Sequence, residues 1–269
     1  MLNLVDLYSL NHLIIDVQET WPKDLLNVLN DSKEILLNFL EEENKIDNEA
    51  IENIMFRINR PENKFQQEWD STVVSIGKII SKSKFMGFHA TRLLKVEQDE
   101  ILDSGLRPLN SELLEFKLKI LLDQGLISLD EYSENMRNSQ VGSLGRENHI
   151  FTFHELRTLG DESGLVRLFR CWGGEFFYYS KEDRKEFRDK FFNIGKATIL
   201  LTSHKYEDVQ RHNVERRMIK NFLNPSRDQG RNDFDNCHSK PLTVIGYIDE
   251  DCKLFYELTS YDKWRILNG

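Results

Sequence analysis

Hydrophobic residues in the first eighty positions follow the spacing of amphipathic helices. A first group recurs largely every three or four residues, which places its members on one stripe of a helix: Leu25, Leu26, Leu29, Ile35, Leu36, Phe39 and Leu40. A second stretch, over residues 47–59, has a stripe that the pattern predicts to be buried, and Pro61 ends it: Ile51, Ile54, Met55 and Ile58. A third helix is predicted to begin near Asp70. Residues 1–80 are therefore predicted to form a helical module.

After residue 80 the pattern changes to short runs of aromatic and β-branched residues, which are typical of strands. These runs cover residues 85–88, 150–153, 175–179, 197–202, 242–248 and 254–258. Helical spacing lies between them, over residues 111–122, 129–137 and 181–192. Strands and helices do not alternate regularly, so residues 81–269 are predicted to form an α+β domain rather than a doubly wound sheet.

Charge and cysteine content narrow the classes of function. The chain has 269 residues, with 36 Lys+Arg against 45 Asp+Glu, a formal net charge of −9. This balance argues against general binding of nucleic-acid phosphates, which needs a clustered positive surface. Residues 1–44 are especially acidic, and a solvated helix face explains this better than DNA mimicry.

No run approaches the roughly 20 apolar residues of a membrane span. Three cysteines without a CxxC pair favour a reducing compartment, so we expect a soluble, cytoplasmic protein with no membrane partner.

Two segments carry candidate chemistry. In the first, Gly87-Phe88-His89-Ala90-Thr91-Arg92-Leu93, strand alternation directs His89 and Thr91 to the same face. An imidazole and a hydroxyl at a strand end can hydrogen-bond a ribose or an amide. The alternative is a core histidine held by a backbone carbonyl, with Arg92 on the surface.

The second segment runs from Arg170 to Tyr179 and reads RCWGGEFFYY. Its two glycines permit close approach of a backbone or a ligand. Glu175 then shares a largely hydrophobic strand face with Phe177 and Tyr179, where a carboxylate is costly to bury without a partner. A catalytic carboxylate fits this placement. Pairing of Glu175 with Arg170 or Arg92 would explain it equally well as structure.

These segments, with the Gly-Leu-Arg-Pro turn at residues 105–108, resemble the ADP-ribosyltransferase fold of poly(ADP-ribose) polymerases, diphtheria-type toxins and RNA 2'-phosphotransferases. The resemblance covers residues 80–258 and implies a mixed or antiparallel split β core with flanking helices. It also implies that NAD is the substrate, held by the segment His89, Ala90, Thr91 and Arg92. Ala90 is a departure, since the phosphotransferases have glycine there.

By the same resemblance, Glu175 assists transfer as the catalytic carboxylate together with His89. Phe151, Phe153, Tyr178 or Tyr179 stacks on nicotinamide. Independently of the resemblance, Arg92 and Arg170 are candidates to clamp the pyrophosphate, because a guanidinium can form bidentate hydrogen bonds with it. Glu257, in a run predicted to be a later strand, is a rival for the catalytic carboxylate.

The implied activity is cleavage of the nicotinamide–ribose bond, with transfer of ADP-ribose to a macromolecular acceptor, protein or nucleic acid, or to water. Bacterial members of this fold often act as toxins or defence effectors. The alternative is a catalytically inactive binding or regulatory module that acts through its acidic helical surface at Glu41–Glu43.

No metal site is predicted from the sequence. Cys237-His238 and Cys252 lack a second close pair that would complete four zinc ligands. The remaining candidate histidines are scattered and are expected to be surface residues or satisfied core residues: His149, His154, His204 and His212. Residues 224–240 are expected to form a long loop, since they contain Pro, Gly and several Asn and Asp residues.

Overall fold

The computed structural model describes residues 4–137, 147–160, 165–174, 190–192, 194–209, 213–225, 235–259 and 261–262. Within these residues the chain combines helices with an antiparallel sheet, which confirms the predicted α+β class. The predicted strand over residues 175–179 lies outside the described residues, as does most of the predicted helix over residues 181–192. None of the described helices is both long and apolar enough to cross a membrane.

The sheet has five strands in the order β4-β2-β1-β3-β5, and every neighbouring pair is antiparallel. The strands are β1 (Phe85–Leu93), β2 (Ile150–Phe153), β3 (Lys196–His204), β4 (Asp235–His238) and β5 (Thr243–Asp249). Four of the predicted strands are therefore confirmed. β4 falls inside the expected loop over residues 224–240, so that expectation is wrong at residues 235–238.

The predicted strand over residues 254–258 is wrong, because this segment forms helix α14 (Lys253–Leu258). A short apolar run fits either a strand or a buried helix. Here the helix directs the side chains of Leu254 and Phe255 into the core, where both are buried. The Phe255 ring packs edge-to-face against the Phe169 ring.

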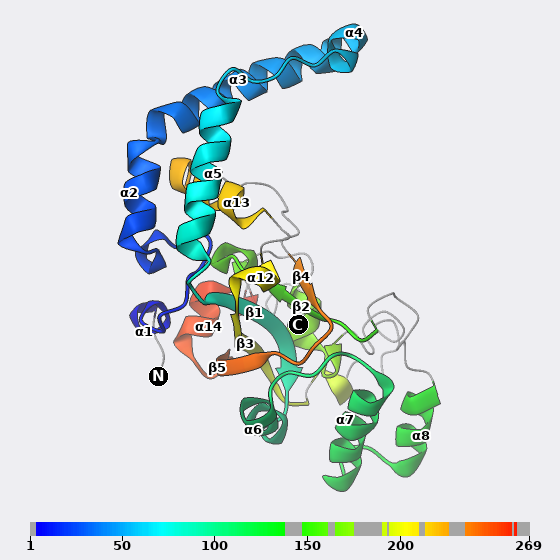
Figure 1. Cartoon of the computed structure of the whole chain (residues 1–269). Helices are drawn as coiled ribbons and strands as arrows, with labels where there is room; N and C mark the ends of the chain where they lie inside the picture. The colour runs from blue at the N-terminus through cyan, green and yellow to red at the C-terminus, as the bar shows by residue number, and fades with distance from the viewer. Residues whose placement is uncertain are drawn as a thin grey trace.

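The two faces of the sheet carry different side chains. One face packs Phe88, Ala90 and Ile199 against α9 (Leu165–Arg170), α14 and η2 (Leu156–Gly160). The opposite face carries His89 and Thr91, and it is covered in part by α6 (Lys95–Ser104). Next along the chain, α7 (Ser111–Asp123) and α8 (Leu129–Arg137) pack against each other (Figure 1). The alternation of β1 therefore separates a hydrophobic core from a more polar face.

The first eighty residues form the helices that Figure 1 shows in blue and cyan. They are α1 (Leu4–Tyr8), η1 (Gln18–Thr20), α2 (Lys23–Asp31), α3 (Lys33–Glu52), α4 (Ile54–Ile58) and α5 (Gln66–Ile80). The first predicted stripe is confirmed, since Leu25, Leu29 and Leu36 are fully buried. The long α3 ends in α4, away from the sheet, and α5 returns beside it.

The second predicted stripe is wrong in its burial. Ile51 is 80% exposed, Ile54 62%, Met55 61% and Ile58 69%, because these residues lie at the far end of the α3–α4 arm. The helical spacing is present, but no described element packs on that end of the arm.

A hydrophobic core crosses the predicted boundary near residue 80. Trp21 and Ile76 from the helical segment cluster with Phe85 of β1. They also cluster with Met218 and Ile219 of α13 (Val214–Leu223), which packs against α5. The remaining short helix, α12 (Tyr206–Val209), adds Val209 to the same cluster.

Candidate functional site

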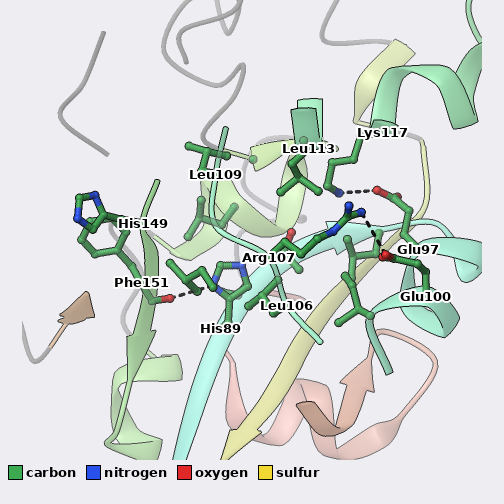
Figure 2. A pocket seen from close by; sticks show the side chains of 18 of the residues that line it. His89, Glu97, Glu100, Leu106, Arg107, Leu109, Leu113, Lys117, His149 and Phe151 are labelled. Carbon is green, nitrogen blue, oxygen red and sulfur yellow. Dashed lines mark hydrogen bonds and ion pairs between the residues drawn. The ribbon is translucent and has the colours of Figure 1, made fainter. Parts of the chain in front are cut away.

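Figure 2 shows a cavity on the sheet face that carries His89. Its walls come from β1, α6, the turn before α7, α7 itself, β2, Leu168 of α9 and residues 173–174. The cavity volume of about 110 Å³ is several times the roughly 10–15 Å³ that one water needs, so a ring-sized group fits. Its polar side chains are His89, Thr91, Glu97, Glu100, Arg107, Lys117 and His149.

His89 presents one ring nitrogen to the cavity. Nδ1–H donates to the carbonyl oxygen of Phe151 at 2.8 Å, an assignment that follows because a carbonyl can only accept. Burial lowers the pKa of His89 below its ordinary value of 6.5, and the nearby Lys117 acts in the same direction. The neutral ring therefore has its lone pair on Nε2, where it can accept a hydrogen bond from a ligand hydroxyl or amide.

A buried ion pair forms the end of the cavity nearest α7. Glu97 is 2% exposed and pairs with Lys117. The Glu97 carboxylate also accepts from Trp172 Nε1–H and from the Leu94 backbone N–H, both at 2.8 Å. The Lys117 ammonium lies 5.4 Å from the centre of the Trp172 ring. The Glu97 carboxylate thus has a cation and two N–H donors within the protein. We therefore interpret Glu97 as a structural residue of the cavity wall and not as a group that awaits a ligand.

The second ion pair is less completely satisfied. Arg107 Nη2 lies 3.1 Å from Glu100 Oε1, and the guanidinium stands 4.5 Å from the centre of the Phe116 ring. Arg107 Nη2 is buried, yet it has no partner in hydrogen-bond geometry. A buried donor of this kind costs free energy unless a ligand acceptor meets it.

His149 adds another unsatisfied atom to the cavity. Its Nδ1 is buried and has no hydrogen-bond partner in the structure. Its ring lies 6.4 Å from the ring of Phe151, centre to centre. Two imidazoles and an aromatic ring therefore line one side of the cavity, as the labelled side chains in Figure 2 show.

Gly173 and Gly174 close the cavity on another side. Both have positive φ, 79° and 45°, a conformation that strongly favours glycine. They directly precede Glu175. Glu175, Tyr178 and Tyr179 lie outside the described residues, so their predicted roles stay predictions.

The two arginines predicted to clamp a pyrophosphate do not line this cavity. Arg92 is buried on the other face of β1 from Thr91, where it donates to the carbonyls of Ile194, Gly195 and Phe169 and pairs with Glu250 at 3.4 Å. Strand alternation is the cause. Arg170 stands over the Phe192 ring at 5.1 Å. Ala90, by contrast, does line the cavity, although its side chain packs into the core on the other face of β1.

Glu257, the rival carboxylate, is also placed away from the cavity. It is exposed on α14 and pairs with Lys253 at 2.8 Å, one helical turn earlier. The strand expected to carry it was a wrong prediction.

Sequence reasoning missed Glu97, Glu100, Lys117 and His149 as lining residues, and it used Arg107 only as part of a turn motif. One signal was available. Lys117 interrupts the otherwise apolar stripe of α7 beside Leu114, Leu118 and Leu121, and a lysine in a buried stripe requires a carboxylate partner.

Comparison of the chain with protein-family models, with curated proteins and with solved structures finds no match.

Proposed function

We propose that this cavity binds NAD and that the chain is an ADP-ribosyltransferase, cleaving the nicotinamide–ribose bond and passing ADP-ribose to a protein, a nucleic acid or water. The observation that supports this most strongly is the pairing of His89 and Thr91 on one face of β1, both lining the same cavity. In the ADP-ribosyltransferases that the sequence resembles, a histidine and a hydroxyl so placed hold the dinucleotide.

The unsatisfied atoms of the cavity suit such a ligand. His89 Nε2 can accept from a ribose hydroxyl, and the buried Arg107 Nη2 can donate to a phosphate or carbonyl oxygen. Phe151 provides ring area for stacking on nicotinamide. In this proposal Arg107 contacts the pyrophosphate in place of Arg92 or Arg170.

The chemistry needs a carboxylate near the ribose, because departure of nicotinamide develops positive charge on that sugar, as in glycoside cleavage. Glu175 is proposed for this role from the family resemblance. The support for it is that Gly174, its neighbour in the chain, lines the cavity. By the same resemblance, the chain would act as a bacterial toxin or defence effector; the cysteine content favours the cytoplasm as its location.

The rival function, binding through the acidic helical surface, receives less support. Glu41 pairs with Lys45 at 2.9 Å, Glu42 with Lys64 at 3.3 Å, and Glu43 with Arg60. These pairs offset the charge that a basic partner would need to recognise.

The test is nicotinamide release from NAD by purified protein, with and without cell extract. Glu175→Gln should lower turnover by about 10²–10³-fold, the usual loss when one group that stabilises transition-state charge is removed. His89→Ala should also lower turnover. Glu257→Gln is the matched control, because it removes an exposed carboxylate far from the cavity, and it should leave turnover unchanged.

Release of nicotinamide that is lost in Glu175→Gln and kept in Glu257→Gln would support the transferase proposal. No release under any condition, with no NAD-induced rise in melting temperature, would reject it and favour the binding module.

A further inference from the structure

Three histidines from separate segments meet on the sheet face that carries His89. His154 directly follows β2, His204 ends β3 and His238 ends β4. One nitrogen from each ring lies within 4.8 Å of the other two. His154 is 0% exposed and His204 2%, and His238 has an intermediate exposure.

A glycine makes room for this cluster. Gly87 pairs with Thr202 across β1 and β3, and a Cβ built on Gly87 would lie 2.4 Å from His204 Nε2. Any larger residue would push the His204 ring out of place. The absence of a side chain at position 87 of β1 thus leaves space for the imidazole rings.

Hydrogen bonds fix the protonation of His154. Its Nδ1 lies 2.9 Å from the Met86 carbonyl oxygen, so Nδ1 carries the hydrogen and Nε2 of the neutral ring carries a lone pair. Metal-binding histidines are usually oriented in this way, with one nitrogen donating to a backbone carbonyl and the other binding the metal. Thr152 Oγ1 lies 3.2 Å from His154 Nε2 and 3.0 Å from His238 Nε2, and its single hydrogen can serve only one of them.

His204 has an unsatisfied nitrogen. Its Nε2 lies 2.7 Å from Thr202 Oγ1, but its Nδ1 is buried and has no hydrogen-bond partner. An unpaired polar atom in such a place is costly without a ligand.

We propose that His154, His204 and His238 bind a zinc ion through one nitrogen each and leave its fourth position to water or to another ligand. Three imidazole ligands without a carboxylate favour a transition metal over calcium or magnesium, which prefer oxygen ligands. At the usual Zn–N distance of about 2.0–2.1 Å, tetrahedral ligand atoms stand roughly 3.4 Å apart. The three nitrogens, which lie within 4.8 Å of one another, would therefore move closer together on binding zinc.

This site is separate from the proposed NAD cavity. Gly87 stands between the two, two residues or about 7 Å along β1 from His89. Zinc binding therefore does not depend on the transferase proposal, and it is tested without measuring activity.

The experiment titrates the chelator-treated full chain with Zn²⁺ by calorimetry and with Co²⁺ by visible absorption. We expect one zinc per chain and the intense absorption of tetrahedral Co²⁺. His238→Asn should weaken zinc binding by at least 100-fold and abolish that absorption. His149→Asn is the matched control, since it changes a histidine outside the cluster, and it should keep both signals.

Because His238 lies at a partly exposed strand end, His238→Asn tests the site with less risk to folding than a change at the buried His204. The Co²⁺ spectrum of the unmodified chain needs no variant. No stoichiometric zinc, an octahedral Co²⁺ spectrum, or binding unchanged in His238→Asn would each overturn the proposal.

Discussion

The buried side chains of the cavity differ in how completely the fold satisfies them. The Glu97 carboxylate has a cation and two N–H donors, whereas Arg107 and His149 each keep one buried nitrogen without a hydrogen bond. His89 is intermediate, with one nitrogen bonded to the backbone and the other facing the cavity. The unsatisfied atoms mark where a ligand is expected, and the satisfied ones mark where a substitution costs stability.

His89 should make stability depend on pH. Its folded pKa is lowered from 6.5 by burial, so the unfolded state binds the proton more readily. The contribution of His89 to the free energy of unfolding is full above about pH 6.5 and is lost as pH falls toward the folded pKa. We expect His89→Gln, which keeps a donor for the Phe151 carbonyl, to show a shallower loss of stability between pH 7 and pH 5. Urea denaturation of both proteins across this range measures it, and identical slopes would contradict the assignment.

The pair Glu97–Lys117 should behave as a buried ion pair. Lys117→Met leaves the Glu97 carboxylate buried without its cation, and we expect the free energy of unfolding to fall by about 3–5 kcal/mol. Adding Glu97→Gln to that variant removes the unpaired charge and should recover part of the loss. Chemical denaturation of the two single variants and the double variant measures the coupling. Strictly additive losses would contradict this account.

At the scale of elements, the α3–α4 arm separates helical spacing from burial. Leu36 and Ile54 both lie on predicted apolar stripes, yet Leu36 is fully buried and Ile54 is 62% exposed. Spacing identifies the apolar side of a helix, but it does not say whether another element covers that side. Leu36 is buried among residues of α2, α5 and α13. The packing of these helices on α3 is a feature of the tertiary structure, which the spacing within one helix does not predict.

This contrast gives a prediction for the arm. Ile54→Gln and Ile58→Gln should each change the free energy of unfolding by no more than about 0.5 kcal/mol, because both side chains are already largely exposed to solvent in the folded state. Leu36→Ala should lower it by about 2–5 kcal/mol. Thermal or chemical denaturation of the three variants provides the comparison. A loss from Ile54→Gln as large as that from Leu36→Ala would show that the tip is covered.

Strands and site residues were predictable where one strand alone decides the outcome. Alternation along β1 correctly placed His89 and Thr91 on one face, and the same rule places Arg92 on the other, against its predicted role. Lys117 could not be assigned to the cavity from sequence, because its position there depends on how α7 packs beside α6. The cluster of His154, His204 and His238 depends on the strand order β4-β2-β1-β3, which no local pattern encodes.

At the scale of the whole molecule, the helical segment and the sheet share a core. Leu13 forms a parallel bridge with Phe85, and Ile15 N–H donates to the His154 carbonyl at 3.2 Å. Asp16 accepts from the backbone N–H groups of Leu156 and Arg157 at 2.7 and 3.0 Å. The N-terminal residues are therefore held to the sheet at several points along their length.

A fragment of residues 81–269 should consequently fold poorly. Removal of the first eighty residues would expose apolar side chains that are now fully buried, among them Phe85, Val214, Met218 and Ile219. We expect the full chain to show a cooperative thermal transition by circular dichroism and the fragment to lack it. A sharp transition in the fragment would instead establish two independently folding domains with a boundary near residue 80.

The arm of α3 and α4 also sets how the molecule moves in solution. A 20-residue helix is about 30 Å long, and α3 directs much of this length away from the sheet (Figure 1). A compact chain of 269 residues would have a radius of gyration of about 18 Å. Because the arm places mass far from the centre of the molecule, small-angle X-ray scattering should give a radius of gyration above this value. The protein should also rotate more slowly about its short axes than about its long axis.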